Sequence, residues 1–339
     1  MKPVRLTVSV MAAIPVSGCA GIQTALGGQA VQSSDFVSLF TIFMVVCTLM
    51  YFVIVGALMW AVLRRRRESE ACTVETGKHE VSTPQSRVAL IAWTSVIAVG
   101  LSALAVASFF TDRSLAAAAR NPKLAITVTA HQWWWDVQYT PVDPSHIIRT
   151  ANELHLPVGV PTEITLKSDD VIHSFWIPNL AGKQDVIPGR VTGAEILPRQ
   201  IGQYRGQCAE FCGAEHTNMA LDVTVESMAD FKKWAAAQLR PATAPTTPLE
   251  AAGFNYVTTR QCSVCHNITG TPASGTVGPD ITHFASRKTI AAGTLPLTTG
   301  NLYGWVADPQ SQKPGSQMPT MQIAPQDLHA IVAYLETLK

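Results

Sequence analysis

The chain has 339 residues, of which 14% are charged, and its formal net charge is +1 at pH 7. Such a low and balanced charge excludes a protein that binds nucleic acid through a basic surface. The length allows two or three domains, and the apolar composition indicates contact with a membrane rather than a purely soluble enzyme.

Residues 1–18 have the pattern of an export signal peptide, with a basic start and an apolar middle. The small residues Ser17 and Gly18 stand directly before Cys19, and this order resembles a bacterial lipobox. We therefore expect cleavage after residue 18 and a lipid on Cys19, which would anchor the mature chain to the membrane. An ordinary leader followed by an incidental cysteine is the alternative.

Two uncharged apolar runs, residues 38–63 and 88–110, are each long enough to cross a bilayer. Residues 64–67 are four arginines, whereas the exported N-terminal segment 19–37 contains no lysine or arginine. Because positive charge favours the cytoplasmic side, we expect residues 64–87 to form a cytoplasmic loop. The sequence thus predicts a transmembrane hairpin in a bacterial inner membrane, with everything beyond residue 110 on the periplasmic side.

The segment 111–240 is rich in predicted strands, and an antiparallel sandwich is the simplest fold for it. Its clearest strand signals are residues 124–129, 163–167 and 220–225. Proline and threonine dominate residues 241–249, which lack the apolar side chains of a core and are expected to be a linker. Residues 250–339 then form a small helical domain.

Two cysteines, a histidine and a methionine fall within twelve residues near the middle of the chain: Cys208, Cys212, His216 and Met219. Thiolate, imidazole and thioether ligands favour copper over hard cations. A loop of this kind normally needs one more ligand from a distant strand, and His173 is the natural candidate.

Two simpler interpretations of this segment compete with a copper site. The spacing of four, four and three also marks one face of a helix, and two exported cysteines could form a disulfide. Gly213 and the surrounding strands speak against a core helix. A disulfide would leave His173, His216 and Met219 without a role, so copper remains the favoured interpretation.

Cys262-Ser-Val-Cys265-His266 is the attachment sequence of a c-type haem, in which two thiols bind the vinyl groups and the imidazole binds iron. A redox-active Cys-x-x-Cys pair is the alternative, but it would need neither His266 nor a distant methionine. Met318, in a proline-flanked loop, is the expected sixth ligand, and Met321 is its competitor. A methionine opposite a histidine suits an iron that carries electrons.

Taken together, these features resemble subunit II of a haem–copper cytochrome c oxidase of the caa type, in which a cytochrome c domain is fused at the C-terminus. The resemblance extends over nearly everything after the signal peptide. It rests on the hairpin, on the haem motifs, and on residues 131–135, 170–174, 183–190, 206–213, 216 and 278–283. It implies a multidomain fold: a two-helix transmembrane hairpin, an all-β cupredoxin sandwich and an all-α class I cytochrome c domain.

The resemblance also implies a dinuclear copper A centre. Cys208 and Cys212 would bridge the two coppers, His173 and His216 would each bind one, and Met219 and the Glu210 carbonyl would be weaker ligands. The Glu210 side chain would reach a magnesium or manganese ion at the border with subunit I.

Among the three consecutive tryptophans, Trp133 matches the family's aromatic residue through which electrons reach copper A. Trp134 and Trp135 are expected to serve packing or the membrane interface. The remaining histidines are expected to be structural or solvated: His79, His131, His146, His155, His283 and His329. One departure is Leu90, which replaces the glutamate that many family members carry near a proton-uptake route, so proton entrance through this subunit is in doubt.

The implied function is to accept electrons through a covalent haem c and to pass them to copper A and then to subunit I, where oxygen is reduced to water. The expected donor is a cytochrome c or a quinol-oxidising complex, and the expected partners are subunit I and subunit III. Two alternatives stay open: a copper A and haem c subunit of a nitric oxide reductase, and a stand-alone membrane-anchored electron-transfer protein.

Overall fold

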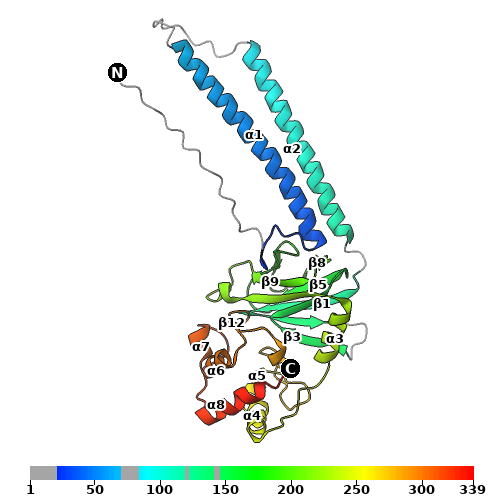
Figure 1. The fold of residues 1–339 in the computed structure, drawn as a ribbon, viewed down its shortest axis with the longest axis vertical. Coiled ribbons are helices and arrows are strands. Elements are labelled where there is room, and N and C mark those ends of the chain that lie inside the picture. Colours follow the sequence, from blue (N-terminus) through cyan, green and yellow to red (C-terminus); the bar gives the residue numbers. More distant parts are fainter. Residues whose placement is uncertain (1–20, 70–83, 119–121, 141–145) are drawn as a thin grey trace, which may run out of the picture.

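The computed structural model describes residues 21–69, 84–118, 122–140 and 146–339. The predicted signal peptide and Cys19 lie outside these ranges. Three parts follow one another in space: a pair of long helices, a sandwich of two sheets, and a C-terminal group of helices at the far end of the sandwich (Figure 1).

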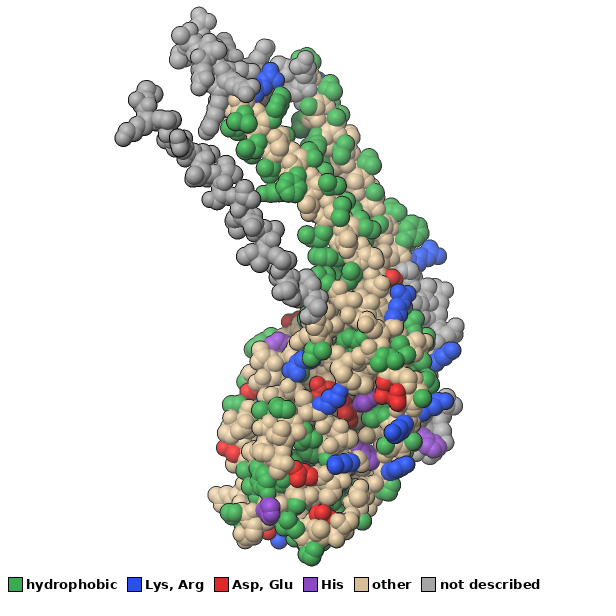
Figure 2. All heavy atoms as spheres, viewed as in Figure 1, with side chains coloured by type: hydrophobic (Ala, Val, Ile, Leu, Met, Phe, Trp, Pro, Cys, Tyr) green, Lys and Arg blue, Asp and Glu red, His purple; other side chains and the backbone are tan. Residues whose placement is uncertain are grey.

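The two long helices are α1 (Val31–Ser69) and α2 (Pro84–Ala118). Each contains a stretch long and apolar enough to cross a membrane, Val31–Arg64 and Arg87–Arg113. Figure 2 shows hydrophobic side chains all along the visible length of these helices, whereas charged side chains are frequent on the rest of the molecule. A helix that is apolar on every side requires lipid or protein around it. Leu90 is one of the exposed side chains of α2.

The sandwich consists of two five-stranded sheets, in the orders β3-β2-β1-β5-β8 and β4-β10-β9-β6-β7. The first contains β1 (Leu124–His131), β2 (Trp134–Tyr139), β3 (Ile148–Ala151), β5 (Thr162–Ser168) and β8 (Thr192–Ile196). The second contains β4 (Glu153–Pro157), β6 (His173–Trp176), β7 (Gln184–Val186), β9 (Gly202–Cys208) and β10 (Ala220–Glu226). Buried and exposed positions alternate along β5, as expected for a strand with one face on a core.

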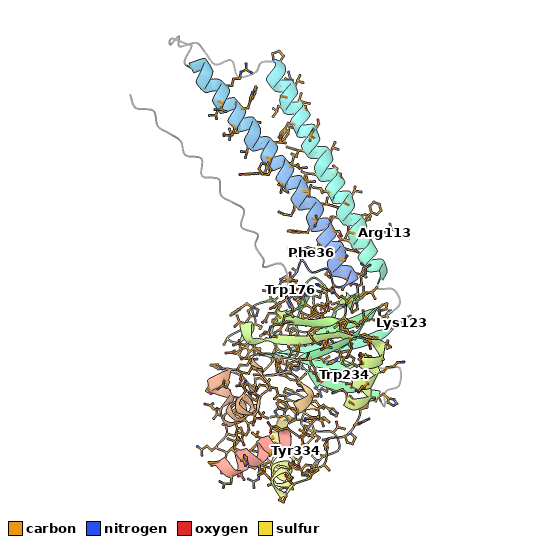
Figure 3. All side chains as sticks on the ribbon, in the orientation of Figure 1. Phe36, Arg113, Lys123, Trp176, Trp234 and Tyr334 are labelled. Carbon is orange, nitrogen blue, oxygen red and sulfur yellow. The ribbon has the colours of Figure 1, made fainter. Side chains whose placement is uncertain are left out.

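The predicted all-β sandwich is confirmed, but the expectation that it is purely antiparallel is wrong in two places. Strand β1 pairs in parallel with β5, and β10 pairs in parallel with β4. Parallel neighbours need a long crossover connection, and the intervening strands supply it in both cases. Helix α3 (Met228–Gln238) follows β10 and packs Trp234 against the core (Figure 3).

The C-terminal domain has its own core, which includes Val257, Leu302, Ile331 and Tyr334. Its helices are α4 (Pro248–Thr259), α5 (Cys262–Cys265), α6 (Thr299–Ala307), α7 (Pro309–Gln312) and α8 (Pro325–Leu335). A short strand pair, β11 (Thr289–Ile290) and β12 (Leu295–Pro296), interrupts the helices. The predicted small helical domain is confirmed.

Polar contacts fasten this domain to the second sheet of the sandwich. Arg287 lies 3.7 Å from Glu153, and the Thr289 hydroxyl donates a 2.5 Å hydrogen bond to Asp222. Lys288 donates to Gln203 at the rim of the same contact. These contacts join residues 287–289 of the C-terminal domain to β4, β9 and β10.

Candidate copper and haem sites

The ends of two strands and the loop after the second bring the predicted copper ligands together. His173 opens β6, Cys208 closes β9, and the loop that follows carries Cys212 before the short 3₁₀ turn His216–Asn218 (η3). Gly213 has a φ of +115°, and a Cβ there would lie 2.9 Å from the Trp133 ring. Glycine is therefore required for the loop to turn against this ring.

Four of the predicted ligand side chains form two neighbouring sulfur–nitrogen pairs. The Cys208 Sγ lies 3.8 Å from His173 Nδ1, and the Cys212 Sγ lies 3.6 Å from His216 Nδ1. The two sulfurs are 3.7 Å apart. His173, Cys208 and Cys212 place their ligand atoms within 4.8 Å of one another.

These distances fit shared metal ions. Tetrahedral sites hold sulfur at about 2.3 Å and nitrogen at about 2.0 Å, which separates two ligands of one ion by roughly 3.5 Å. The sulfur–sulfur distance is far beyond the ~2.05 Å of a disulfide, and both cysteines are free. Two soft thiolates beside two imidazoles form a ligand set for copper.

The remaining predicted ligands lie at the same place. Met219 is completely buried in the core cluster that includes Cys208 and Cys212. The Glu210 carbonyl oxygen lies 3.3 Å from the Cys208 Sγ. The Glu210 side chain instead points toward Lys183, at 3.4 Å, outside the cluster.

Hydrogen bonds orient the buried His173 for metal binding. Its Nε2 lies 2.8 Å from the Asp170 carboxylate, which leaves Nδ1 facing the thiols. Burial works to lower the pKa of His173, but the Cys208 thiol and the Asp170 carboxylate outweigh it and raise this pKa. A carboxylate on the outer nitrogen is the usual way to fix a ligating imidazole.

The two thiols shift each other's pKa in opposite directions. A hydrogen bond from Cys212 lowers the pKa of the Cys208 thiol to about 3, and burial opposes the shift. The same interaction raises the pKa of Cys212. The pair therefore favours the thiolate form of Cys208, and the thiolate is the form that binds metals.

A cavity of about 450 Å³ lies between the sandwich and the C-terminal domain. It is lined by the predicted haem residues Cys262, Cys265, His266, Met318 and Met321, and also by Trp133, Trp134, Phe284 and Trp305. Both cysteines are free, as thioether attachment requires. The apolar lining and the ligand residues therefore fit a haem.

His266 is prepared to bind iron. Its Nδ1 lies 2.8 Å from the Pro279 carbonyl oxygen, which accepts the ring proton and leaves Nε2 free as a ligand. Burial lowers the pKa of His266, so the ring is neutral at pH 7. A Cβ at Gly278 would lie 2.8 Å from the ring, so this position requires glycine.

The loop that carries Met318 is fixed by Gln310. The Gln310 amide donates to the Met318 carbonyl at 2.7 Å and to the Ser316 carbonyl at 2.7 Å, and it accepts from the Gly315 amide at 2.9 Å. Met321 lines the same cavity, so the choice between the two methionines stays a prediction.

The comparisons with known proteins agree with this pair of sites. Residues 143–227 match the family described as cytochrome c oxidase subunit II, periplasmic domain, and residues 250–339 match cytochrome c. The cytochrome c oxidase subunit 2 of Alkalihalophilus pseudofirmus is 31% identical over 255 residues, which cover 74% of this chain and 72% of that protein. The chain belongs to the cytochrome c oxidase subunit II family.

A second subunit II, from Bacillus sp. strain PS3, is 30% identical over 269 residues, which cover 74% of each chain. The crystal structure of the periplasmic domain of subunit II of cytochrome oxidase (CoxB) of Bradyrhizobium japonicum is 26% identical, with a TM-score of 0.34. It covers 35% of this chain and 96% of its own. The two family matches and the two curated relatives confirm the resemblance drawn from the motifs, and subunit I is the implied partner of this subunit II.

As a subunit II, the chain has a copper-binding site and a fused cytochrome c domain. The structure brings the candidate ligand residues together, and it adds several residues around them that the sequence did not single out as partners: Gln132, Asp170 as a partner of His173, Gln310 and Lys313. Asp170 stands only three residues before His173, so this pair has a local signal in the motif. The contacts of Lys313 join distant segments and leave no such signal.

The three consecutive tryptophans lie in three different environments. Trp133 lines the haem cavity, and its indole Nε1 donates a 3.0 Å hydrogen bond to the Cys212 carbonyl. Trp134 stacks on His131 at 4.4 Å, and Trp135 is 1% exposed in the core of the sandwich. Of the three tryptophans, Trp133 is the one that lines the haem cavity and also binds the copper loop, as its neighbour Gln132 does.

Proposed function

We propose that this subunit II receives single electrons at a haem c in residues 250–339 and delivers them through a copper A centre in residues 111–240 to subunit I, which reduces oxygen to water. Residues 241–249 would be the linker that keeps the two domains at high local concentration. The observation that supports this most strongly is the position of Trp133 between the haem cavity and the copper loop.

The residues that would hold each group follow from the geometry. Cys262 and Cys265 would attach the haem, with His266 and Met318 as axial ligands. His173, Cys208, Cys212, His216, Met219 and the Glu210 carbonyl would hold two copper ions. When bound there, the haem and the copper ions would each accept and release one electron at a time.

The chain's own side chains would prepare both sites. The candidate copper ligands Cys208, Cys212 and Met219 are buried, which would limit the access of water to a metal bound there. Gln132 and Trp133 both donate to the Cys212 carbonyl, at 2.7 Å and 3.0 Å, and so hold the copper loop against the haem cavity. A rigid loop keeps the ligand geometry constant while an electron arrives and leaves.

The proposal extends to ions and partners at the membrane. The Glu210 carboxylate, now beside Lys183, would bind magnesium or manganese together with residues of subunit I. Residues 38–63 and 88–110 would be the spans of a bacterial inner membrane, with 64–87 on the cytoplasmic side, and a lipid on Cys19 would add an anchor. Subunit III would complete the complex, and a cytochrome c or a quinol-oxidising complex would be the donor.

The experiment is to purify the tagged chain from its own membranes in mild detergent. Reduced-minus-oxidised optical spectra, copper content and oxygen uptake are then measured on the same preparation. We expect a c-type haem, copper, an additional haem from subunit I and oxygen uptake to purify together. A Cys262→Ala and Cys265→Ala double variant is the control, and it should lose the c-type haem alone.

A preparation that holds c-type haem and copper but no further haem and no oxygen uptake, from an intact sample, would contradict the oxidase function. It would instead support a stand-alone electron carrier. Nitric oxide reduction without oxygen uptake would support the alternative reductase.

A further inference from the structure

One lysine is buried where the two domains meet. Lys313 is 2% exposed, and its Nζ donates to the carbonyls of Asn218 at 2.7 Å, Trp133 at 2.8 Å and Ala291 at 3.0 Å. An ammonium group has three donors, and all three are satisfied. The sandwich supplies two of the acceptors and the C-terminal domain supplies the third.

Each residue that accepts a hydrogen bond from Lys313 lies close to one of the predicted electron carriers. All three bonds go to backbone carbonyls and none to a ligand side chain. Asn218 stands between the copper ligands His216 and Met219 in the sequence. Trp133 lines the haem cavity and binds the Cys212 carbonyl through its indole. The lysine itself precedes Met318 by five residues, in the loop that Gln310 fixes.

A buried ammonium is a costly way to join two surfaces. Burial lowers the pKa of Lys313 to about 8, although Glu215 and Cys212 oppose the shift. Apolar side chains often stabilise a contact as well as buried charges do. The ammonium group instead fixes the relative positions of three backbone segments, because each of its three hydrogen bonds goes to a different one.

The segment of the C-terminal domain (hereafter the haem domain) that accepts a hydrogen bond from Lys313 is a turn with a strained backbone. Ala291 and Ala292 have φ of +52° and +57°, which non-glycine residues rarely adopt. The turn directs three successive carbonyls outward. Those of Ala291, Ala292 and Gly293 accept hydrogen bonds from Lys313, from the Ala220 amide at 2.9 Å and from Arg205 at 3.2 Å. Strain of this kind persists where the surroundings hold it, and here docking does so.

We propose that Lys313 is a positioning residue that holds the haem domain against Trp133 and the copper loop, and so sets the rate of electron transfer between the two sites. The inference rests on the proposed function, because it assumes that haem and copper are bound at these sites. Lys313 is not a ligand, so its loss should separate the carriers without removing either.

The test compares Lys313→Met and the milder Lys313→Gln with the wild type in the complete purified complex. Lys288→Met is the matched control, since Lys288 also bridges the domains but is exposed at the rim of the contact. Haem attachment, the optical signature of methionine ligation and copper content are measured first. A photoexcited ruthenium complex then reduces the haem, and the haem and copper absorption bands report the transfer rate.

We expect Lys313→Met to retain both groups and to slow the transfer by about tenfold or more, since small misplacements have large effects on rate. Lys313→Gln should fall between it and the wild type, and Lys288→Met should stay within about twofold. Hydrogen exchange in residues 289–294 should become faster in Lys313→Met alone. This readout reports docking independently of electron transfer.

Equal transfer rates in all four proteins would contradict the role of Lys313 and leave the proposed function intact. Loss of haem or copper in both Lys313 variants would also contradict it, because the lysine would then be needed to hold the groups. Absence of haem-to-copper transfer in the wild type would instead refute the proposed function.

Discussion

Single residues next to the candidate ligands decide how the ligands point. The Asp170 carboxylate fixes the ring of His173, and the Pro279 carbonyl fixes that of His266. Gly213 and Gly278 leave the space that these arrangements need. Each site therefore depends on neighbours that bind no metal themselves.

Replacing Cys212 by serine should abolish the signal of an electron shared between two coppers. The Cys212 sulfur lies next to both the Cys208 sulfur and His216 Nδ1, and a serine oxygen is a poor copper ligand. Electron paramagnetic resonance and copper content measure the effect. The control is Cys47→Ser, at an exposed thiol of α1, and an unchanged signal in Cys212→Ser would rule out a bridging thiolate there.

Replacing Met318 by leucine should leave the haem covalently attached but lower its reduction potential, by on the order of 0.1 V within the ~0.8 V that axial ligands span. A thioether favours reduced iron, and leucine removes that ligand. A redox titration followed at the haem band measures it. Met321→Leu is the matched control, and the reverse result would assign the ligand to Met321.

At the scale of elements, the haem domain depends on a close crossing of α4 and α8. A Cβ at Gly253 would lie 1.9 Å from the Ala330 carbonyl oxygen, so only glycine allows this approach. Overpacking of a core typically costs 1–3 kcal/mol. We expect Gly253→Ala to lower the free energy of unfolding of this domain by about 2 kcal/mol or more.

Gly300, in α6, is the control for that substitution, because a Cβ there meets nothing within 4 Å. Gly300→Ala should be neutral or stabilising by up to about 1 kcal/mol. Urea unfolding followed at the haem absorption band measures both variants. Equal stability of the two variants would show that the helices can separate without loss.

The contact between β4, β10 and α3 should make stability depend on pH. His155 lies 2.8 Å from Glu226 and 3.9 Å from Glu153, and stacks on Trp234. Burial works to lower the pKa of His155, but the two carboxylates outweigh it and raise this pKa. The stabilisation is therefore fully present below the unfolded pKa of about 6.5 and is lost as pH rises through the higher folded value.

The measurement for His155 is the thermal midpoint of the wild type and of His155→Gln across the neutral range. The wild type should be the more stable protein at acidic pH, and the difference should shrink as pH rises. A difference that grows with pH would mean that His155 is neutral in the folded protein.

At the scale of the whole molecule, the membrane helices leave one end of the sandwich and the haem domain covers the other (Figure 1). The parts themselves were predictable, because each has a local signature: two apolar runs, alternating strands, a ligand-rich loop and a haem motif. The grouping of the candidate ligands Cys208, Cys212 and His216 was predictable for the same reason, since they stand within nine residues.

What could not be predicted is how distant segments meet. The parallel pairs β1–β5 and β4–β10 depend on the strand order, which no short segment encodes. Lys313 reaches the Trp133 carbonyl over 180 residues of sequence. The strained turn at Ala291 has no sequence signal either, because its conformation follows from the surface that it docks against.

The measurement that tests the central claim most directly is the rate of haem-to-copper electron transfer in the complete complex, after light-triggered reduction of the haem. It compares the wild type with Trp133→Phe and with Trp134→Phe, which lines the same cavity but does not bind the Cys212 carbonyl. We expect transfer in the wild type, a rate lower by on the order of tenfold in Trp133→Phe, and little change in Trp134→Phe. Equal rates in the three proteins would contradict a path through Trp133. If the copper of the wild type is reduced no faster than by the external reductant alone, electron transfer from the haem to the copper is contradicted.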